Sequence, residues 1–221
     1  MSNIAKKAIV EEPPLSVEET EKLLLERLQN AKTEDDHFRW LLFVVGYYRG
    51  ADRIDAAKAL LQRFLVESTK AEHKVHCHLA LGQIATDQQE FQNALNHFTA
   101  ALGLKPASKK VEYVLLNNAG YCHNMLGRYS EGERQCRMAL ELDWVRPSAY
   151  RNLGVSLHGA GNLVAAAWAL VESNKADPSD NRARVLLERL VSLNPDLVVA
   201  SPWIMDGLDP SNTKVIETSL V

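Results

Sequence analysis

An adjacent pair of residues ending in glycine recurs three times at the same place in a longer pattern. The pairs are Leu81-Gly82, Ala119-Gly120 and Leu153-Gly154. Apolar and small residues follow each pair at matching offsets, and the stretches that contain the pairs begin at Val75, Tyr113 and Pro147, 38 and 34 residues apart. A repeat of this length indicates a fold in which one supersecondary unit stacks on copies of itself.

Each stretch has the pattern of two amphipathic helices joined by a turn, with Gly127 and Gly161 at the turn in two of them. The pattern resembles the tetratricopeptide repeat, a 34-residue helix-turn-helix unit whose small residues let its two helices approach closely. His78 and Gly132 depart from it, since Trp or Leu and Ala are usual at those positions. The resemblance implies an all-α fold, a right-handed solenoid whose first helices line the concave face.

The repeat register divides the chain into segments. We expect regular repeats at 75–108, 113–146 and 147–180, and a degenerate unit at 33–71 in which Val44 and Val45 replace the small residues. Ser16 and Glu19 have the spacing of a capping box, as do Thr69 with Glu72 and Ser130 with Glu133. An N-terminal capping helix is expected at 15–32, a C-terminal capping helix at 181–195, and tails at 1–14 and 196–221. The second tail reads as too broken for a helix, and we leave open whether it packs on the solenoid, binds a partner or is disordered.

Composition limits the partners. Lys and Arg number 25 against 28 Asp and Glu, which leaves no basic surplus to neutralise a nucleic acid. The N-terminus has too few consecutive apolar residues for a signal peptide. The sequence contains no run of eighteen apolar residues, so no membrane insertion is predicted. Three cysteines, all within helical patterns, indicate reduced buried thiols and a cytoplasmic protein.

No motif of an enzyme, cofactor site or metal site is recognised. His73, His76, Cys77 and His78 are clustered, but two of them fall at core positions and no second ligand pair completes a tetrahedral set. The HGAGN stretch at 158–162 falls at a turn between helices. We therefore expect a non-catalytic protein without cofactor or metal.

Asn118 and Asn152 occupy the same position in consecutive repeats, immediately before the small pair. In relatives within the repeat family, asparagine at this position hydrogen-bonds the backbone of a bound peptide, so the resemblance implies a two-rung ladder here. The equivalent residues of the flanking units are Phe43 and Ala80. Replacing both asparagines with alanine is expected to weaken peptide binding and leave the melting temperature nearly unchanged.

Other side chains share this helix face by the spacing of three and four residues. Tyr121 and Met125 would supply apolar contacts, and Arg151 could clamp a carboxylate; the alternative is an ordinary solvated helix face. Leu79 and Val114 stand where relatives that bind chaperone tails carry clamp lysines, which argues against that ligand. The predicted groove comprises Asn117, Asn118, Tyr121, Asn124, Met125, Arg151, Asn152, Val155 and His158.

The function predicted from the sequence is an adaptor that holds a peptide segment of a protein partner in the concave groove. Two alternatives stay open. One is a dedicated chaperone for a bacterial secretion substrate, and the other is a structural assembly subunit that self-associates through its convex face or an end.

Overall fold

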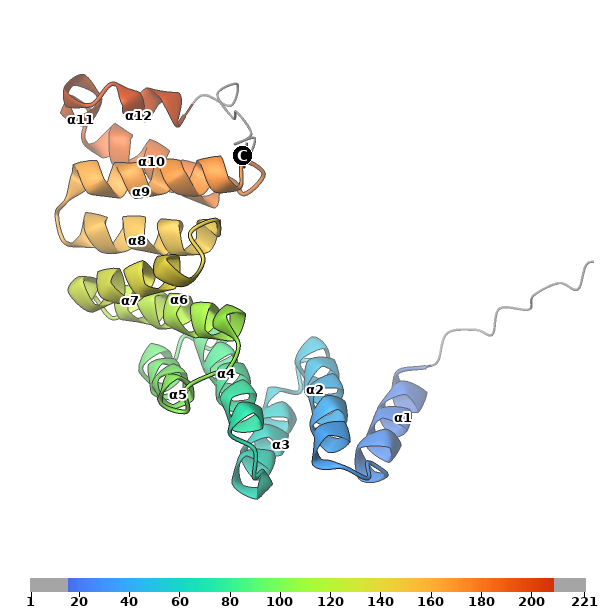
Figure 1. Cartoon of the computed structure of the whole chain (residues 1–221). Helices are drawn as coiled ribbons and strands as arrows, with labels where there is room; N and C mark the ends of the chain where they lie inside the picture. Colours follow the sequence, from blue (N-terminus) through green and yellow to red (C-terminus); the bar gives the residue numbers. More distant parts are fainter. Residues whose placement is uncertain (1–15, 209–221) are drawn as a thin grey trace, which may run out of the picture. The chain divides into compact units, whose positions relative to one another are not determined.

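Every regular element between residues 16 and 208 is a helix (Figure 1). The coordinates are a computed structural model, which describes residues 16–208 of the chain. The chain divides into two units, Met1–Phe64 and Leu65–Val221. Both are built from helical hairpins, which confirms the predicted all-α repeat fold.

The first unit contains α1 (Val17–Gln29), α2 (Glu34–Gly50) and most of α3 (Ile54–Glu67). The capping box predicted at Ser16 and Glu19 forms at the start of α1. Val44 and Val45 are buried, so branched side chains do fill the place that small residues hold elsewhere. The other two predicted capping boxes are wrong, because α4 and α7 begin after Lys70 and Arg128 without a side-chain cap.

A polar contact fixes α1 on α2. The Tyr48 hydroxyl donates to Glu21 at 3.0 Å, and Arg53 Nη1 donates to the same carboxylate at 2.6 Å. The Arg53 guanidinium also lies over the Tyr48 ring, 4.3 Å from its centroid. Two donors thus meet one carboxylate of the helix that was predicted to cap the repeats, and the cation–π contact joins the two residues that donate.

The second unit stacks three hairpins in chain order (Figure 1). The first helices of the hairpins are α4 (Ala71–Asp87), α6 (Lys109–Met125) and α8 (Pro147–Gly159), and the second helices are α5 (Phe91–Gly103), α7 (Tyr129–Leu142) and α9 (Leu163–Ala176). Two first helices, α4 and α6, begin before the predicted repeat starts at 75 and 113.

The recurring glycines allow the two helices of each hairpin to touch. A Cβ atom built on Gly82, Gly120 or Gly154 would lie 2.4, 2.6 or 2.7 Å from a side chain of the second helix. Those side chains belong to Phe98, Cys136 and Leu170, each sixteen residues after its glycine. The same packing therefore repeats three times, and it explains why the sequence keeps a residue without a side chain there.

The turns inside the hairpins repeat too. Each of the four has one residue with positive φ: Asp52 at 57°, Gln89 at 61°, Gly127 at 72° and Gly161 at 82°. Glycine adopts this conformation without steric cost, whereas Gln89 does so against its preference. Shared turn geometry at Asp52 supports the interpretation of α2 and α3 as a degenerate repeat.

The C-terminal part of the described chain is helical and packed, which corrects the expectation that it is too broken for a helix. After α10 (Asn181–Leu193) come two short helices, α11 (Asp196–Ala200) and α12 (Trp203–Asp206). Leu197 and Ile204 are buried, and Asn174 Nδ2 donates to the Gly207 carbonyl at 3.0 Å. Residues 196–208 therefore pack on the solenoid, while 209–221 and the predicted tail at 1–14 lie outside the described residues.

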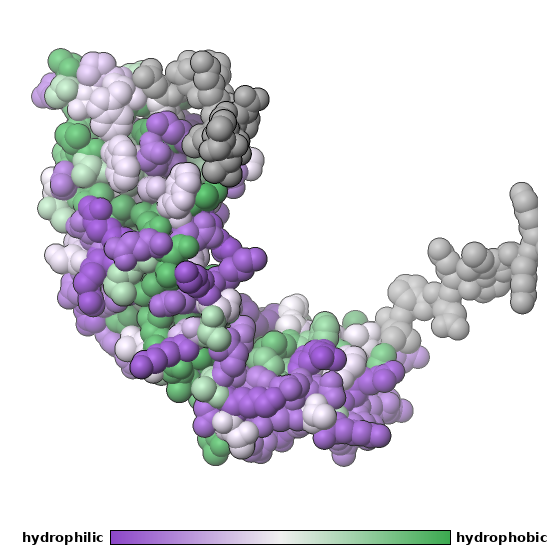
Figure 2. Space-filling view, viewed as in Figure 1, coloured by the Kyte–Doolittle hydropathy of each residue, from purple (hydrophilic) through white to green (hydrophobic). Residues whose placement is uncertain are grey.

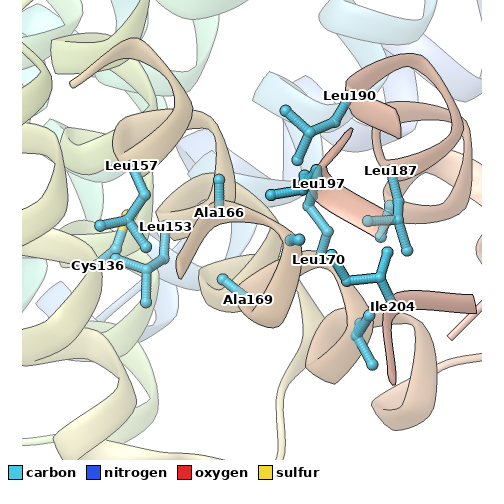
Figure 3. Packing of buried hydrophobic residues seen from close by; sticks show 13 residues of the cluster. Cys136, Leu153, Leu157, Ala166, Ala169, Leu170, Leu187, Leu190, Leu197 and Ile204 are labelled. Carbon is cyan, nitrogen blue, oxygen red and sulfur yellow. The ribbon is translucent and has the colours of Figure 1, made fainter. Parts of the chain in front are cut away.

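The helix α9 has buried side chains on both sides (Figure 3). Leu153 and Leu157 lie on one side of it, and Leu187, Leu190 and Ile204 lie on the other. The C-terminal helices thus continue the core beyond the last repeat. On the face shown in Figure 2, hydrophobic residues of this unit are interleaved with hydrophilic ones.

Candidate functional site

A groove of about 400 Å³ crosses the first helices of the last two repeats and the helix that follows them. Six of the nine predicted site residues line it: Tyr121, Asn124 and Met125 from α6, and Arg151, Asn152 and Val155 from α8. The remaining walls come from α10, through Asn181, Arg182, Val185 and Leu186. Helical spacing therefore located one side of the groove, and α10 supplies the other.

The other three predicted residues lie elsewhere. Asn117 is buried, Asn118 is half-buried, and neither lines the groove. His158 lines a second cavity beside the groove. The predicted set is thus only partly brought together.

The Asn152 amide lies between helices, contrary to the expected ladder. Asn152 is 7% exposed, and its Nδ2 donates to Asn117 Oδ1 at 2.9 Å and to the Asn117 carbonyl at 3.4 Å. Asn118 accepts a long contact of 3.5 Å from Asn117 Nδ2. The two asparagines share a repeat position but not an environment, because Asn152 finds a partner on the preceding first helix.

A second pair of polar side chains extends this buried seam. Asn124 Nδ2 donates to the Asn152 carbonyl at 2.8 Å, and Ser156 Oγ donates to Asn124 Oδ1 at 2.7 Å. A Cβ atom on Gly132 would lie 2.3 Å from Asn124 Oδ1 and 2.9 Å from Ser156 Oγ. Gly132 departs from the repeat pattern because the Asn124 carboxamide fills the space of the usual methyl group. We call Asn117, Asn124, Asn152 and Ser156 the polar seam.

Two arginines share one carboxylate at the edge of the groove. Asp180 is the N-cap of α10, and its Oδ1 accepts the Arg182 backbone N–H at 3.1 Å. Arg182 Nη2 lies 2.6 Å and Arg151 Nη1 lies 2.9 Å from Asp180 Oδ2. These hydrogen bonds, chiefly those from Arg182, lower the pKa of Asp180 to about 2.

Arg151 is held in a less favourable environment. Its side chain is 15% exposed, so burial, followed by the nearby Arg182 charge, lowers the pKa of its guanidinium. Within residues 16–208 its guanidinium makes one hydrogen bond, to Asp180. Arg151 is therefore partly neutralised rather than fully available as the predicted carboxylate clamp.

A second cavity of about 230 Å³ adjoins the groove. The two share Val155 and Leu186 as lining residues. We call this cavity the apolar pocket, and its lining consists of Gly154, Val155, His158, Leu170, Leu186, Arg189, Leu190 and Leu193. The sequence placed Leu186 and Leu190 on a capping helix but gave no sign that a cavity would remain beneath them.

The structure also shows a histidine pair that the sequence did not reveal. His78 Nδ1 lies 3.0 Å from His97 Nδ1, between α4 and α5. Burial, and then the neighbouring His97, lower the pKa of His78. His73 and Cys77 are buried, and within residues 16–208 no three potential ligand side chains gather as a metal site.

Between residues 16 and 208, no helix combines the length and the apolar character that a membrane span requires.

Known proteins share the repeat architecture. No protein-family model matches the sequence. The chain is 32% identical over 118 residues to an uncharacterised TPR repeat-containing protein of Arabidopsis thaliana, a match that covers 50% of this chain and 14% of the relative. It is 31% identical over 103 residues to the Hsp70-Hsp90 organizing protein of Triticum aestivum, covering 46% of this chain and 17% of that protein.

The fold is similar to solved repeat structures. One is the crystal structure of YrrB, described as a TPR protein with an unusual peptide-binding site, which superposes with a TM-score of 0.55. The superposition covers 85% of this chain and 99% of that chain at 16% sequence identity. At this identity the likeness shows the fold alone, whereas the curated relatives match in sequence over about half of this chain.

Proposed function

The chain belongs to the tetratricopeptide-repeat family, and from this premise we propose that it is a non-catalytic adaptor that binds a peptide segment of a partner protein in the groove. Relatives in this family are in general protein-interaction modules. The wheat relative is named for organising Hsp70 and Hsp90, and the YrrB structure is described by its peptide-binding site. Those descriptions belong to those proteins and support the class of function proposed here.

The observation that carries the proposal is the accessible apolar material within the groove. Met125 is 50% exposed and Val185 is 52% exposed, and they stand on opposite walls of the groove, on α6 and α10. Tyr121 packs its ring edge-on against Phe91, 6.0 Å between centroids, which fixes it in position. Apolar side chains held on rigid helices are suited to a peptide partner.

The partner proposed is a protein, at a cytoplasmic location and without nucleic acid. A chaperone tail bound through a carboxylate clamp is not proposed, because Leu79 and Val114 replace the cations of that clamp. The secretion-chaperone and assembly-subunit alternatives predict different behaviour of the purified protein. The first would co-purify with an insoluble, unstructured cargo, and the second would show a mass that rises with protein concentration.

The test uses two double variants as bait for affinity purification from an extract of the native source, and mass spectrometry identifies the proteins that each variant recovers. Met125→Ala with Val185→Ala truncates the groove, and Met138→Ala with Val164→Ala truncates comparably exposed residues on α7 and α9 that do not line it. The groove variant should bind its partner at least about fivefold more weakly, since each lost apolar contact contributes of order 1 kcal/mol. Equal recovery of the same partner with both variants would remove the groove as the binding site.

A further inference from the structure

The lining of the groove and the apolar pocket has one sign of charge. It includes Arg151, Arg182 and Arg189, and it contains no Asp or Glu side chain. The whole chain has a formal net charge of −3, so this lining is opposite in sign to the protein as a whole. Opposite charge on the ligand is the arrangement that steers encounter and fixes register.

The carboxylate at the edge of the groove does not cancel this charge. Asp180 accepts from both Arg151 and Arg182, so one negative charge balances two positive ones. Arg182 is 68% exposed along its side chain, and it holds Asp180 through Nε at 2.7 Å and Nη2 at 2.6 Å, which leaves its other N–H groups for a ligand. A carboxylate that entered beside Asp180 would find two guanidinium groups with donors to spare.

The size of the apolar pocket limits which apolar side chain of a ligand it can hold. Its volume is about 230 Å³, and four leucines contribute to its lining. An apolar cavity of about 150 Å³ is large enough to hold a benzene molecule. One leucine or phenylalanine side chain would therefore fit, entering from the groove past Val155 and Leu186.

Resting on the proposed function, we propose that the ligand is an acidic peptide segment with one large apolar side chain. The apolar side chain enters the pocket between α8 and α10, and an acidic side chain of the same segment lies against Arg182 and Arg151. The helix α10 thus acts as a wall of the binding site as well as the cap of the repeats. The site differs from the carboxylate clamp of the chaperone-binding relatives, whose lysine positions are Leu79 and Val114 here.

The test begins with a random dodecapeptide display library selected on the purified full chain. Enriched peptides are then synthesised with a fluorophore, and binding is measured by anisotropy at low and high salt. Each peptide is paired with two variants, one with its acidic residues changed to glutamine and one with its largest apolar residue changed to alanine. A single-stranded oligodeoxynucleotide serves as the alternative polyanion.

The protein variants isolate the charge. Arg182→Gln with Arg189→Gln removes two lining charges on α10, and Arg184→Gln removes one from the same helix outside both cavities. Arg184 is 39% exposed and pairs with Glu188, so its loss leaves the groove unchanged. Circular dichroism and urea unfolding confirm that each variant is folded.

We expect acidic peptides to be enriched. Changing the largest apolar residue of the peptide to alanine should weaken binding by about 10- to 100-fold. Arg182→Gln with Arg189→Gln should weaken peptide binding by about 4- to 25-fold, since each lost charge weakens it by about two- to fivefold. Arg184→Gln should weaken binding by less than about twofold. Binding should weaken further as salt is raised.

Three results would overturn the proposal. Neutral or basic peptides that lose binding with the Met125→Ala, Val185→Ala variant would refute the acidic ligand and leave the proposed function standing. Peptides that bind equally to that variant and to the parent would refute the proposed function as well. An oligodeoxynucleotide that binds more tightly than any peptide, and is released by Arg182→Gln with Arg189→Gln, would assign the groove to nucleic acid.

Discussion

Two neighbouring spaces beside α8 differ in what fills them. Between α6 and α8 the space is occupied by the polar seam, whose members hydrogen-bond one another at 2.7 to 3.4 Å. Between α8 and α10 the corresponding space is an apolar pocket of about 230 Å³. The first space is filled by side chains of the protein itself, and the second is a cavity that shares Val155 and Leu186 with the groove.

The difference separates structural polar residues from residues that can meet a ligand. A buried amide whose donors are bonded within the protein contributes to stability and register. Asn124 and Asn152 reach the groove wall, but their Nδ2 groups already donate to Asn152 and Asn117. An apolar cavity that opens on a groove gains free energy when an apolar group enters it. Substitutions in the polar seam should therefore change stability, and substitutions in the apolar pocket should change binding.

Asn152→Ala should destabilise the protein and barely affect binding. The change removes both hydrogen bonds to Asn117 and leaves buried polar atoms without a partner, which costs about 2 to 3 kcal/mol. Urea unfolding measures the loss, and a groove peptide should bind within about threefold of the parent. Asn118→Ala is the matched control, with an expected change below about 0.5 kcal/mol. This replaces the expectation from sequence that both asparagines could be removed without loss of stability, and a stable Asn152→Ala that cannot bind would restore the ladder.

Val155→Phe should close the apolar pocket. Val155 lines both cavities, so a larger ring at this position occupies the space intended for the ligand side chain. Peptide affinity should fall at least about tenfold, a change of about 1.4 kcal/mol, while the free energy of unfolding changes by less than about 1 kcal/mol. Unchanged affinity in a folded variant would show that the pocket is not used.

Gly132→Ala should lower stability by about 1 kcal/mol, although alanine is the better helix former. The gain in helix propensity is about 1 kcal/mol, and the collision with Asn124 and Ser156 costs about 2. Adding Asn124→Ala removes the obstacle, so the two changes should be less than additive in a double-mutant cycle. Strict additivity of the two free energies would mean that the missing methyl group and the Asn124 amide are unrelated.

Asp180→Asn should have the smallest effect, a loss of stability that is present at neutral pH and disappears in acid. The pKa of Asp180 is lowered to about 2 from the ordinary 3.8, so its contribution to stability is full above pH 3.8 and is lost as the pH falls through 2. Asparagine keeps the N-cap, so the difference between parent and variant isolates the charge. Urea unfolding at several pH values should show that difference shrinking below pH 3.8, and a constant difference would contradict the paired carboxylate.

The repeat fold could be predicted because it depends on short-range spacing. Gly82, Gly120 and Gly154 each meet a side chain sixteen residues later, and this offset is visible in the sequence. The groove wall on α6 and α8 followed from helical periodicity for the same reason. These features require knowledge of one hairpin only.

The features that could not be predicted from the sequence depend on how neighbouring helices are rotated and spaced. Asn118 and Asn152 are equivalent in sequence, and only the approach of α6 to α8 shows that Asn152 donates to Asn117. The apolar pattern of α10 would look the same whether Leu186 and Leu190 were fully covered or left a cavity. The short helices after Leu193 were missed because Leu197 and Ile204 are too few to produce a periodic pattern.

The most direct test of whether a ligand uses the apolar pocket and not the polar seam is an NMR titration of the full chain. The ligand is an acidic peptide with one large apolar side chain, selected from the display library. Assigned methyl and side-chain amide resonances report the α8–α10 pocket and the α6–α8 seam in the same experiment. We expect the largest chemical-shift changes at the methyl groups of Val155, Leu186 and Leu190, with small changes at the side-chain amides of Asn117 and Asn152. The largest changes at the asparagine amides, with the pocket methyl groups unmoved, would contradict this expectation.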